Sequence, residues 1–300
     1  MRWKFALTTT LLLVLSSALF APQPRPPITG LCFVTARVSS LGEADKFYAK
    51  GLALPRSREC WTMDANTCFY ITPYQDIELL PADASGAAGS LDLIGIWTEN
   101  ASTLHSYLLA RGVKVGDLIS VTRNFQFFEL SDPEEHRLRF LSIPGPTHTI
   151  REPPEQVSHH MIHTGFVVRD RAALDRFYKD ILGFHIYWHG GMKDDETNWV
   201  DMQVPDGSDW LEYMLNVPPN ASHKTLGVMN HIALGVPDIH AAQQQLLKNG
   251  WKGTEQPKIG RDGKWQLNLY DPDDTRVELM EFTPVEKPCC SEYTGPHPRQ

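Results

Sequence analysis

One arrangement occurs four times in this 300-residue chain, and it constrains the fold more than any other feature. A strand of alternating residues runs into an amphipathic helix, and short alternating strands follow it. The clearest copies begin at residues 158–184 and 230–251, where a glycine ends each helix. Asp170 and Asp238 stand at the turn into these helices, where N-cap residues occur. The repeated unit is therefore β-α-β-β-β.

Two weaker copies occupy the first half of the chain. The segment "LCFVTARVSSLGEADKFYAKGLAL" aligns with the third copy through its Phe-Tyr pair at 47–48. The segment "LDLIGIWTENASTLHSYLLARGVKV" aligns with the fourth copy through its helix-ending Gly112. Residues 144–157 contain several prolines and form a natural linker between the two pairs of units. We therefore expect two halves, each built from two units.

The N-terminus differs from the rest of the chain. Residues 1–21 combine Arg2 and Lys4 with an apolar run and small residues, which is the form of a secretory signal peptide or, if uncleaved, of an N-terminal anchor. A Pro-rich spacer follows at 22–29. We expect an exported protein, periplasmic or secreted. No other apolar run reaches the ~20 residues of a membrane span, so no further membrane contact is expected.

Composition limits the classes of partner and of metal site. The net charge of −8 argues against nucleic acid, because no basic stripe is available to neutralise phosphates. None of the five cysteines has the CxxC spacing of a structural zinc site. Cys60 and Cys68 could bridge a hairpin, whereas Cys289 and Cys290 lie in residues 285–300, which we expect to form a flexible tail.

The paired units resemble the vicinal oxygen chelate superfamily, which includes glyoxalase I, bleomycin-resistance proteins and extradiol ring-cleaving dioxygenases. The segments that carry the resemblance are "IHTGFVVRDRAALDRFYKDILGF", "LEYMLN", "NHIALGV" and "DPDDTRVELMEF". It is strong after residue 158 and weak before it. The resemblance implies an α+β fold in which four β-α-β-β-β modules pair into two open, barrel-like halves of eight strands. The two domains would span residues 30–143 and 158–284.

In that superfamily a metal ion lies on the concave face, held by the first and last strands of each module. Carried over residue by residue, the ligands are His163, Glu212, His231 and Glu278. From His163 to Glu212 is 49 residues and from His231 to Glu278 is 47, as a pseudo-twofold site requires. Strand alternation places both glutamates opposite their apolar neighbours, toward the cavity. Imidazole with carboxylate suits one divalent ion: Fe, Ni, Zn, Mn or Co.

The first half serves as an internal control for this assignment. The same alignment places Phe33 and Leu93 at the first-strand positions, and Glu78 and Arg139 at the last-strand positions. Only one of these four residues is a metal-ligand type. We therefore expect a degenerate, metal-free copy in the first half.

The resemblance implies two different chemistries. In a glyoxalase-type enzyme the metal polarises vicinal oxygens and stabilises an enediolate, with Glu212 as the first candidate for the base and Glu278 as the second. In an extradiol dioxygenase, Fe(II) would be held by His163, His231 and Glu278. Such dioxygenases carry a catalytic histidine near the position of Glu212, so we predict a metal-dependent lyase or isomerase of glyoxalase type. The dioxygenase is the alternative, favoured by the four-module layout, and a non-catalytic small-molecule binding or resistance protein is the third candidate.

Two further strands are expected to shape a substrate pocket. Alternation in "FHIYWHG" and "KWQLNLY" places polar and aromatic residues on one face of each strand. The residues predicted to bind a small-molecule substrate are Tyr187, His189, Lys264, Gln266, Asn268 and Tyr270. The two-half layout permits a monomer or a homodimer.

Overall fold

The computed structural model describes residues 24–65, 67–82, 90–122, 124–145 and 150–300. The expected signal peptide or anchor at 1–21 lies outside these residues. Within them, no helix is both long enough and apolar enough to span a membrane.

The first half contains two of the expected modules. Their elements are β1 (Ile28–Val38), α1 (Leu41–Asp45) continued by the π-helix η1 (Lys46–Gly51), β2 (Arg56–Ser57), β3 (Thr67–Thr72), β4 (Gln75–Pro81), β5 (Ser90–Thr98), α2 (Ala101–Leu109), β6 (Ile119–Ser120), β7 (Gln126–Ser131) and β8 (Arg137–Ser142). β1 begins two residues inside the expected spacer, because Ile28 is buried against the sheet.

The second half repeats this order and adds one helix. Its elements are β9 (Met161–Val167), α3 (Arg171–Asp175) continued by η2 (Arg176–Ile181), β10 (His185–Gly190), β11 (Trp199–Gln203), β12 (Trp210–Met214), α4 (His223–Met229), β13 (His231–Val236), α5 (Ile239–Lys248), β14 (Lys258–Ile259), β15 (Trp265–Tyr270) and β16 (Arg276–Glu281). The expected N-caps are confirmed, since Asp170 and Asp238 accept hydrogen bonds from Ala173 N and Ala241 N. Helix α4 was not expected.

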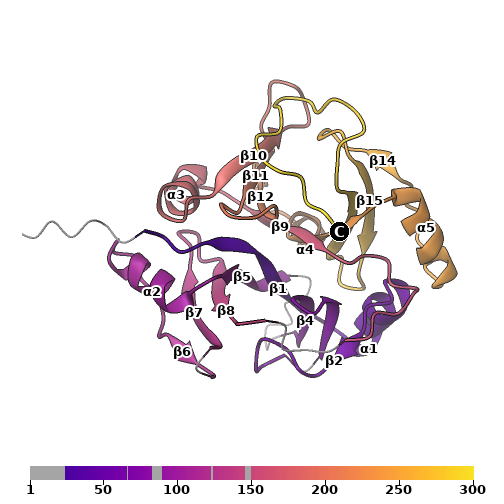
Figure 1. Cartoon of the computed structure of the whole chain (residues 1–300). Helices are drawn as coiled ribbons and strands as arrows, with labels where there is room; N and C mark the ends of the chain where they lie inside the picture. The colour runs from indigo at the N-terminus through magenta and orange to yellow at the C-terminus, as the bar shows by residue number, and fades with distance from the viewer. Residues whose placement is uncertain (1–23, 66, 83–89, 123, 146–149) are drawn as a thin grey trace, which may run out of the picture.

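Both halves form an eight-stranded mixed sheet with the same strand order. The first sheet runs β2-β3-β4-β1-β5-β8-β7-β6, and the second runs β10-β11-β12-β9-β13-β16-β15-β14. Two modules therefore meet in each half through an antiparallel pair, β1 with β5 and β9 with β13. Figure 1 shows the indigo and magenta half below the orange and yellow half, with α1, α2, α3 and α5 at their flanks and α4 near the centre of the view. The predicted α+β fold of four modules in two halves is confirmed.

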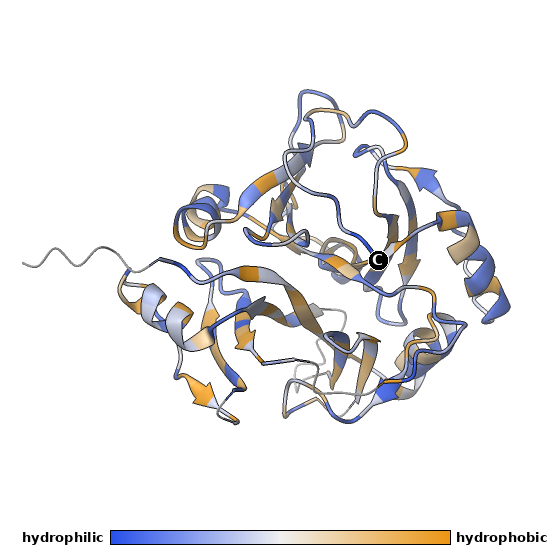
Figure 2. Ribbon diagram, viewed as in Figure 1, coloured by the Kyte–Doolittle hydropathy of each residue, from blue (hydrophilic) through white to orange (hydrophobic). Residues whose placement is uncertain are grey.

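Contacts between the halves are exchanged in symmetry-related pairs. The Tyr48 hydroxyl of the first half donates to Asp271 of the second at 3.1 Å, and the Tyr178 hydroxyl of the second half donates to Asp132 of the first at 3.1 Å. One hydrophobic cluster runs through both halves, from Ile28 to Leu279. In Figure 2 the strands mix apolar and polar residues, as sheets with one buried face do, whereas the long connections are mostly polar. One hydrophobic cluster therefore joins the two halves.

The C-terminal segment 285–300 differs from the flexible tail that we expected. It lies along β10 and β11, where Thr294 N donates to the Tyr187 carbonyl at 3.0 Å and Gln203 Nε2 donates to the Pro296 carbonyl at 2.9 Å. The backbone of the segment is thus held by partners on the sheet that its own composition does not reveal.

The cysteine pairs lie at opposite ends of the described chain. Cys60 is joined to Cys68, as the sequence suggested, and Cys289 is joined to its neighbour Cys290. Cys32 is buried and forms no disulfide.

Candidate metal centre and its cavity

The four predicted ligands come together on the concave face of the second sheet, from strands β9, β12, β13 and β16. Nε2 of His163 lies 3.0 Å from Nε2 of His231. One carboxylate oxygen of Glu212 lies 2.9 Å from His231 Nε2 and 3.6 Å from His163 Nε2. A Glu278 oxygen lies 3.8 Å from both nitrogens. The residues that the sequence placed in register are therefore neighbours in space.

These atoms fit a single divalent ion. The ring nitrogen Nδ1 of His231 lies 3.0 Å from the Met229 carbonyl, so a proton on Nδ1 leaves the Nε2 lone pair directed at the site. Burial lowers the pKa of His163 well below its ordinary value and keeps that ring neutral, as a ligand requires. Two nitrogens ~2.1 Å from one ion and at right angles to each other lie about 3 Å apart, close to the separation found here.

Neighbouring residues hold the two rings in place. The His163 ring stacks on Trp210, with centroids 4.7 Å apart. The His231 ring occupies the space above Gly165, where an added Cβ would lie 2.0 Å from a ring atom. The absence of a side chain at position 165 therefore gives the imidazole room to lie against the strand.

A cavity of about 280 Å³ opens beside these ligands. Trp188, Trp199 and Trp210 supply flat apolar walls, and Gln266 and Asn268 supply amide groups. The Oδ1 atom of Asn268 is buried and has no hydrogen-bond partner among the described residues. An aromatic slot with a few polar groups is the usual form of a small-molecule site.

Of the six residues predicted to bind substrate, the structure places Gln266 and Asn268 in the cavity wall. Tyr187 and Lys264 are fully buried outside the wall, in contact with Trp210. His189 and Tyr270 are not part of the wall either; the backbone of His189 is instead bonded to Ser291.

An irregularity in strand β10 explains why Tyr187 and His189 are not in the cavity wall as predicted. A register shift between Ile186 and Trp188 marks a bulge or irregularity against β11. Such a shift breaks the strict alternation on which the prediction depended, so Trp188 joins the wall instead of facing away. A bulge of this kind leaves no clear signal in the sequence.

Three other wall residues could have been found from the sequence. Asp201 lies opposite Glu212 in the β11–β12 ladder, and Trp199 is two residues before it on the same face. Arg276 precedes Glu278 by two residues, and its guanidinium lies 3.9 Å from that carboxylate and 4.0 Å from Glu212. The period of two in a strand was signal enough for all three.

Acidic residues in the wall have raised pKa values. Burial, reinforced by the charge of Glu212, raises the pKa of Asp201 well above its ordinary value. Burial also raises the pKa of Asp262 to about 6, although the positive charge of Lys264 opposes the shift. A carboxyl group with a raised pKa keeps its proton to a higher pH than a free aspartate does, and a protonated carboxyl can donate a hydrogen bond.

Strand registers confirm the expected correspondence between the two halves. Phe33 pairs with Gly95 and Thr35 with Leu93, just as His163 pairs with Ala233 and Gly165 with His231. On the parallel sides, Glu78 pairs with Thr35 as Glu212 pairs with Gly165, and Arg139 pairs with Gly95 as Glu278 pairs with Ala233. All four positions of the degenerate copy are those that the sequence alignment proposed.

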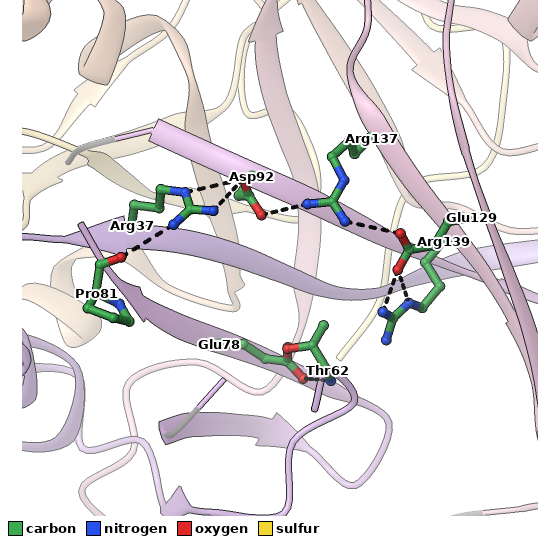
Figure 3. A network of polar contacts seen from close by, with 8 residues as sticks. All are labelled: Arg37, Thr62, Glu78, Pro81, Asp92, Glu129, Arg137 and Arg139. Carbon is green, nitrogen blue, oxygen red and sulfur yellow. Dashed lines mark hydrogen bonds and ion pairs between the residues drawn. The ribbon is translucent and has the colours of Figure 1, made fainter. Parts of the chain in front are cut away.

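The interior of the first half is closed at these positions. Figure 3 shows Glu78 bonded to Thr62, and Arg139 paired with Glu129. Arg139 also donates to the Trp61 carbonyl at 2.7 Å. Phe33, Leu93 and Trp61 belong to one apolar cluster. Of the described residues, the groups of ligand type that lie close enough together to share an ion are in the second half: His163, Glu212 and His231, and a second group of Asp194 with the disulfide-bonded Cys289 and Cys290.

Comparison with solved structures gives the same architecture over both halves. A variant of homoprotocatechuate 2,3-dioxygenase from B. fuscum is 15% identical with a TM-score of 0.65, covering 86% of this chain and 72% of that one. The anaerobic complex of that enzyme from Brevibacterium fuscum with 3,4-dihydroxyphenylacetate is 16% identical with a TM-score of 0.63, covering 86% and 82%. At this identity the likeness concerns the fold.

A search of curated proteins found no match. The family model of the Glyoxalase/Bleomycin resistance protein/Dioxygenase superfamily matches residues 160–279. These residues contain the four candidate ligands and the strands that carry them. Through residues 160–279, the second half of the chain is similar to this superfamily.

Proposed function

We propose that this protein is a metal-dependent enzyme that acts on a small molecule with adjacent oxygen atoms, and that extradiol ring cleavage is the leading candidate reaction. The observation that carries the proposal is one complete set of two histidines and two glutamates within a two-half chain. Solved extradiol dioxygenases share the two-half fold over 86% of this chain. This support favours the dioxygenase over the glyoxalase-type reaction expected from the sequence.

In this proposal His163, His231 and Glu278 hold the metal. Bound Fe(II) would supply the redox chemistry with dioxygen and sites for two adjacent substrate oxygens. Trp188, Trp199 and Trp210 enclose a flat ring and exclude water. The unpartnered Oδ1 of Asn268 accepts a hydrogen bond from a substrate hydroxyl, which orients the ring in the slot.

Glu212 gives the second candidate a specific basis. Its carboxylate lies 2.9 Å from His231 Nε2, within the group of ligands. Among the described residues that line the cavity, His163 is the one histidine. It is a candidate metal ligand, and a metal-bound histidine is not free to act as a base. Proton transfer therefore falls to carboxylates, above all Glu212, which suits a lyase or isomerase that moves a proton beside a carbonyl.

Metal analysis of anaerobically purified protein, beside Glu212→Gln, separates the two. About one Fe(II) per chain, retained in Glu212→Gln and accompanied by oxygen uptake on catechols, supports the dioxygenase. About one Ni, Zn, Mn or Co, bound more weakly by Glu212→Gln and without oxygen uptake, supports the lyase or isomerase.

The matched control is Glu78→Gln, which changes the corresponding glutamate of the first half and leaves metal content unchanged if the two halves differ as proposed. Absence of metal in both the wild type and the variants, even after reconstitution, would exclude both enzymes and leave a binding protein.

A further inference from the structure

A lysine is buried beside the metal centre, and none of the described carboxylates lies close enough to form an ion pair with it. Lys264 is 0% exposed. Among the described residues, its ammonium has one hydrogen bond, to the Tyr187 hydroxyl at 3.4 Å. A buried ammonium with so little hydrogen bonding is costly unless other groups stabilise its charge.

Three aromatic rings surround the ammonium. Its Nζ atom lies 4.7 Å from the ring centroid of Trp210, 5.2 Å from that of Tyr293 and 5.3 Å from that of Tyr187. Cation–π attraction operates at these distances and is stronger away from water. The rings come from β12, from the C-terminal segment and from β10, so one cation joins three separate parts of the chain.

One of these rings connects the cation to the metal centre. The indole of Trp210, which faces the ammonium, also stacks on the imidazole of His163, with centroids 4.7 Å apart and planes 30° apart. The orientation of a metal-bound imidazole depends on the groups that pack and bond against it. A shift of Trp210 would therefore change the orientation of the His163 ring.

A second ring connects the cation to the C-terminal segment. The Tyr293 hydroxyl donates to the Asp262 carbonyl at 2.8 Å, and Asp262 lies in the cavity wall. Trp188 Nε1, on another side of that wall, donates to the Cys289 carbonyl at 3.1 Å. The segment thus contacts the cavity wall from outside at two points. Lys264 contacts the segment through the Tyr293 ring.

We propose that Lys264 is a positioning residue that fastens the C-terminal segment 285–300 to the second half and holds Trp210 against His163. The segment is then a structural part of the active site. The predicted change in Co²⁺ affinity rests on the proposed metal site. The predicted change in hydrogen exchange of the segment does not, because it is measured in metal-free protein.

The test compares Lys264→Met, which removes the charge and keeps the length, with Lys252→Met at an exposed position. Amide hydrogen exchange of residues 285–300 is measured in metal-free protein, and Co²⁺ affinity by its absorption spectrum against a competing chelator. We expect Lys264→Met to exchange about tenfold faster in this segment and to bind Co²⁺ about tenfold more weakly. Since removing a buried charge often stabilises a fold, the melting temperature should stay equal or rise.

A second pair of variants tests the cage, by which we mean the three aromatic rings around the Lys264 ammonium, if Lys264→Met does not fold. Tyr293→Leu removes the ring and should reproduce both effects, whereas Tyr293→Phe keeps the ring, loses only the hydrogen bond to Asp262 and should show a clearly smaller change. Unchanged exchange in Lys264→Met, or in Tyr293→Leu, would overturn the proposal. Faster exchange with unchanged Co²⁺ affinity would overturn the link to His163. If wild type binds no Co²⁺, the proposed function fails, and exchange with Trp210 fluorescence decides the cage separately.

Discussion

The two halves have the same strand order and register, yet their interiors differ completely. At four matched positions the second half carries His163, His231, Glu212 and Glu278, and the first half carries Phe33, Leu93, Glu78 and Arg139. The second sheet opens into a cavity of about 280 Å³. The first is filled by an apolar cluster around Trp61.

The difference teaches that the fold supplies four convergent positions, and the residues there decide what the interior does. Ligands with lone pairs leave space for an ion and a substrate. In the first half, the Phe33 ring and the Leu93 side chain fill that space. The charge of Arg139 is neutralised by its pairing with Glu129. The closed half is filled by packing, and the open half keeps a cavity beside the candidate ligands.

The largest effect should come from reopening the closed half. Trp61 is 5% exposed and packs edge-on against Trp97 and Phe125. Trp61→Ala should lower the free energy of unfolding by about 3–5 kcal/mol, because the cavity that it leaves cannot collapse fully. Urea unfolding measures this, and Co²⁺ affinity should stay at the wild-type value. A loss below ~1 kcal/mol would mean that the first half is not closed by packing.

A smaller effect should appear as a pH dependence of the first half. Burial raises the pKa of Glu78 from 4.5 to about 7, although hydrogen bonds from Thr62 oppose the shift. The folded protein then holds a proton that the unfolded chain releases, so stability falls as pH rises from about 4.5 to about 7 and levels off above that. The loss should approach ~3 kcal/mol.

Urea unfolding of wild type and Glu78→Gln at several pH values measures this contribution. The variant should lack much of the decline, because a glutamine has no proton to lose. Equal pH slopes in the two proteins would show that Glu78 is not the group responsible.

The smallest effect should come from Gly165, whose counterpart in the first half is Thr35. Gly165→Ala places a Cβ 2.0 Å from the His231 ring, so the imidazole must move. Co²⁺ affinity should fall by about 10–100-fold. Thr35→Ala at the matched position is the control and should leave Co²⁺ affinity unchanged. Equal affinities for Gly165→Ala and wild type would mean that the ring is not held against this strand.

Much of the fold and of the candidate centre could be predicted because both depend on local patterns. The period of two in strands, the N-caps at Asp170 and Asp238 and the near-equal spacing of the His–Glu pairs are all visible along the chain. The degenerate positions Phe33, Leu93, Glu78 and Arg139 could be aligned for the same reason. The period of two also contained Asp201 and Arg276, although they were not chosen.

The choice between reactions was less accessible. The sequence argument weighted Glu212 and favoured a glyoxalase-type enzyme, whereas the likeness of the whole chain to solved dioxygenases favours the alternative.

The sequence by itself determined the four modules and their pairing into halves, because strand period and spacing are properties of neighbouring residues, and its resemblance to a known superfamily indicated the four candidate ligands. Only the tertiary structure decided that Trp188 joins the cavity wall through the register shift in β10, and that Tyr187 and Lys264 are buried behind Trp210. It also decided that residues 285–300 pack along the second sheet. These outcomes depend on partners far away in the chain, and no local pattern records them.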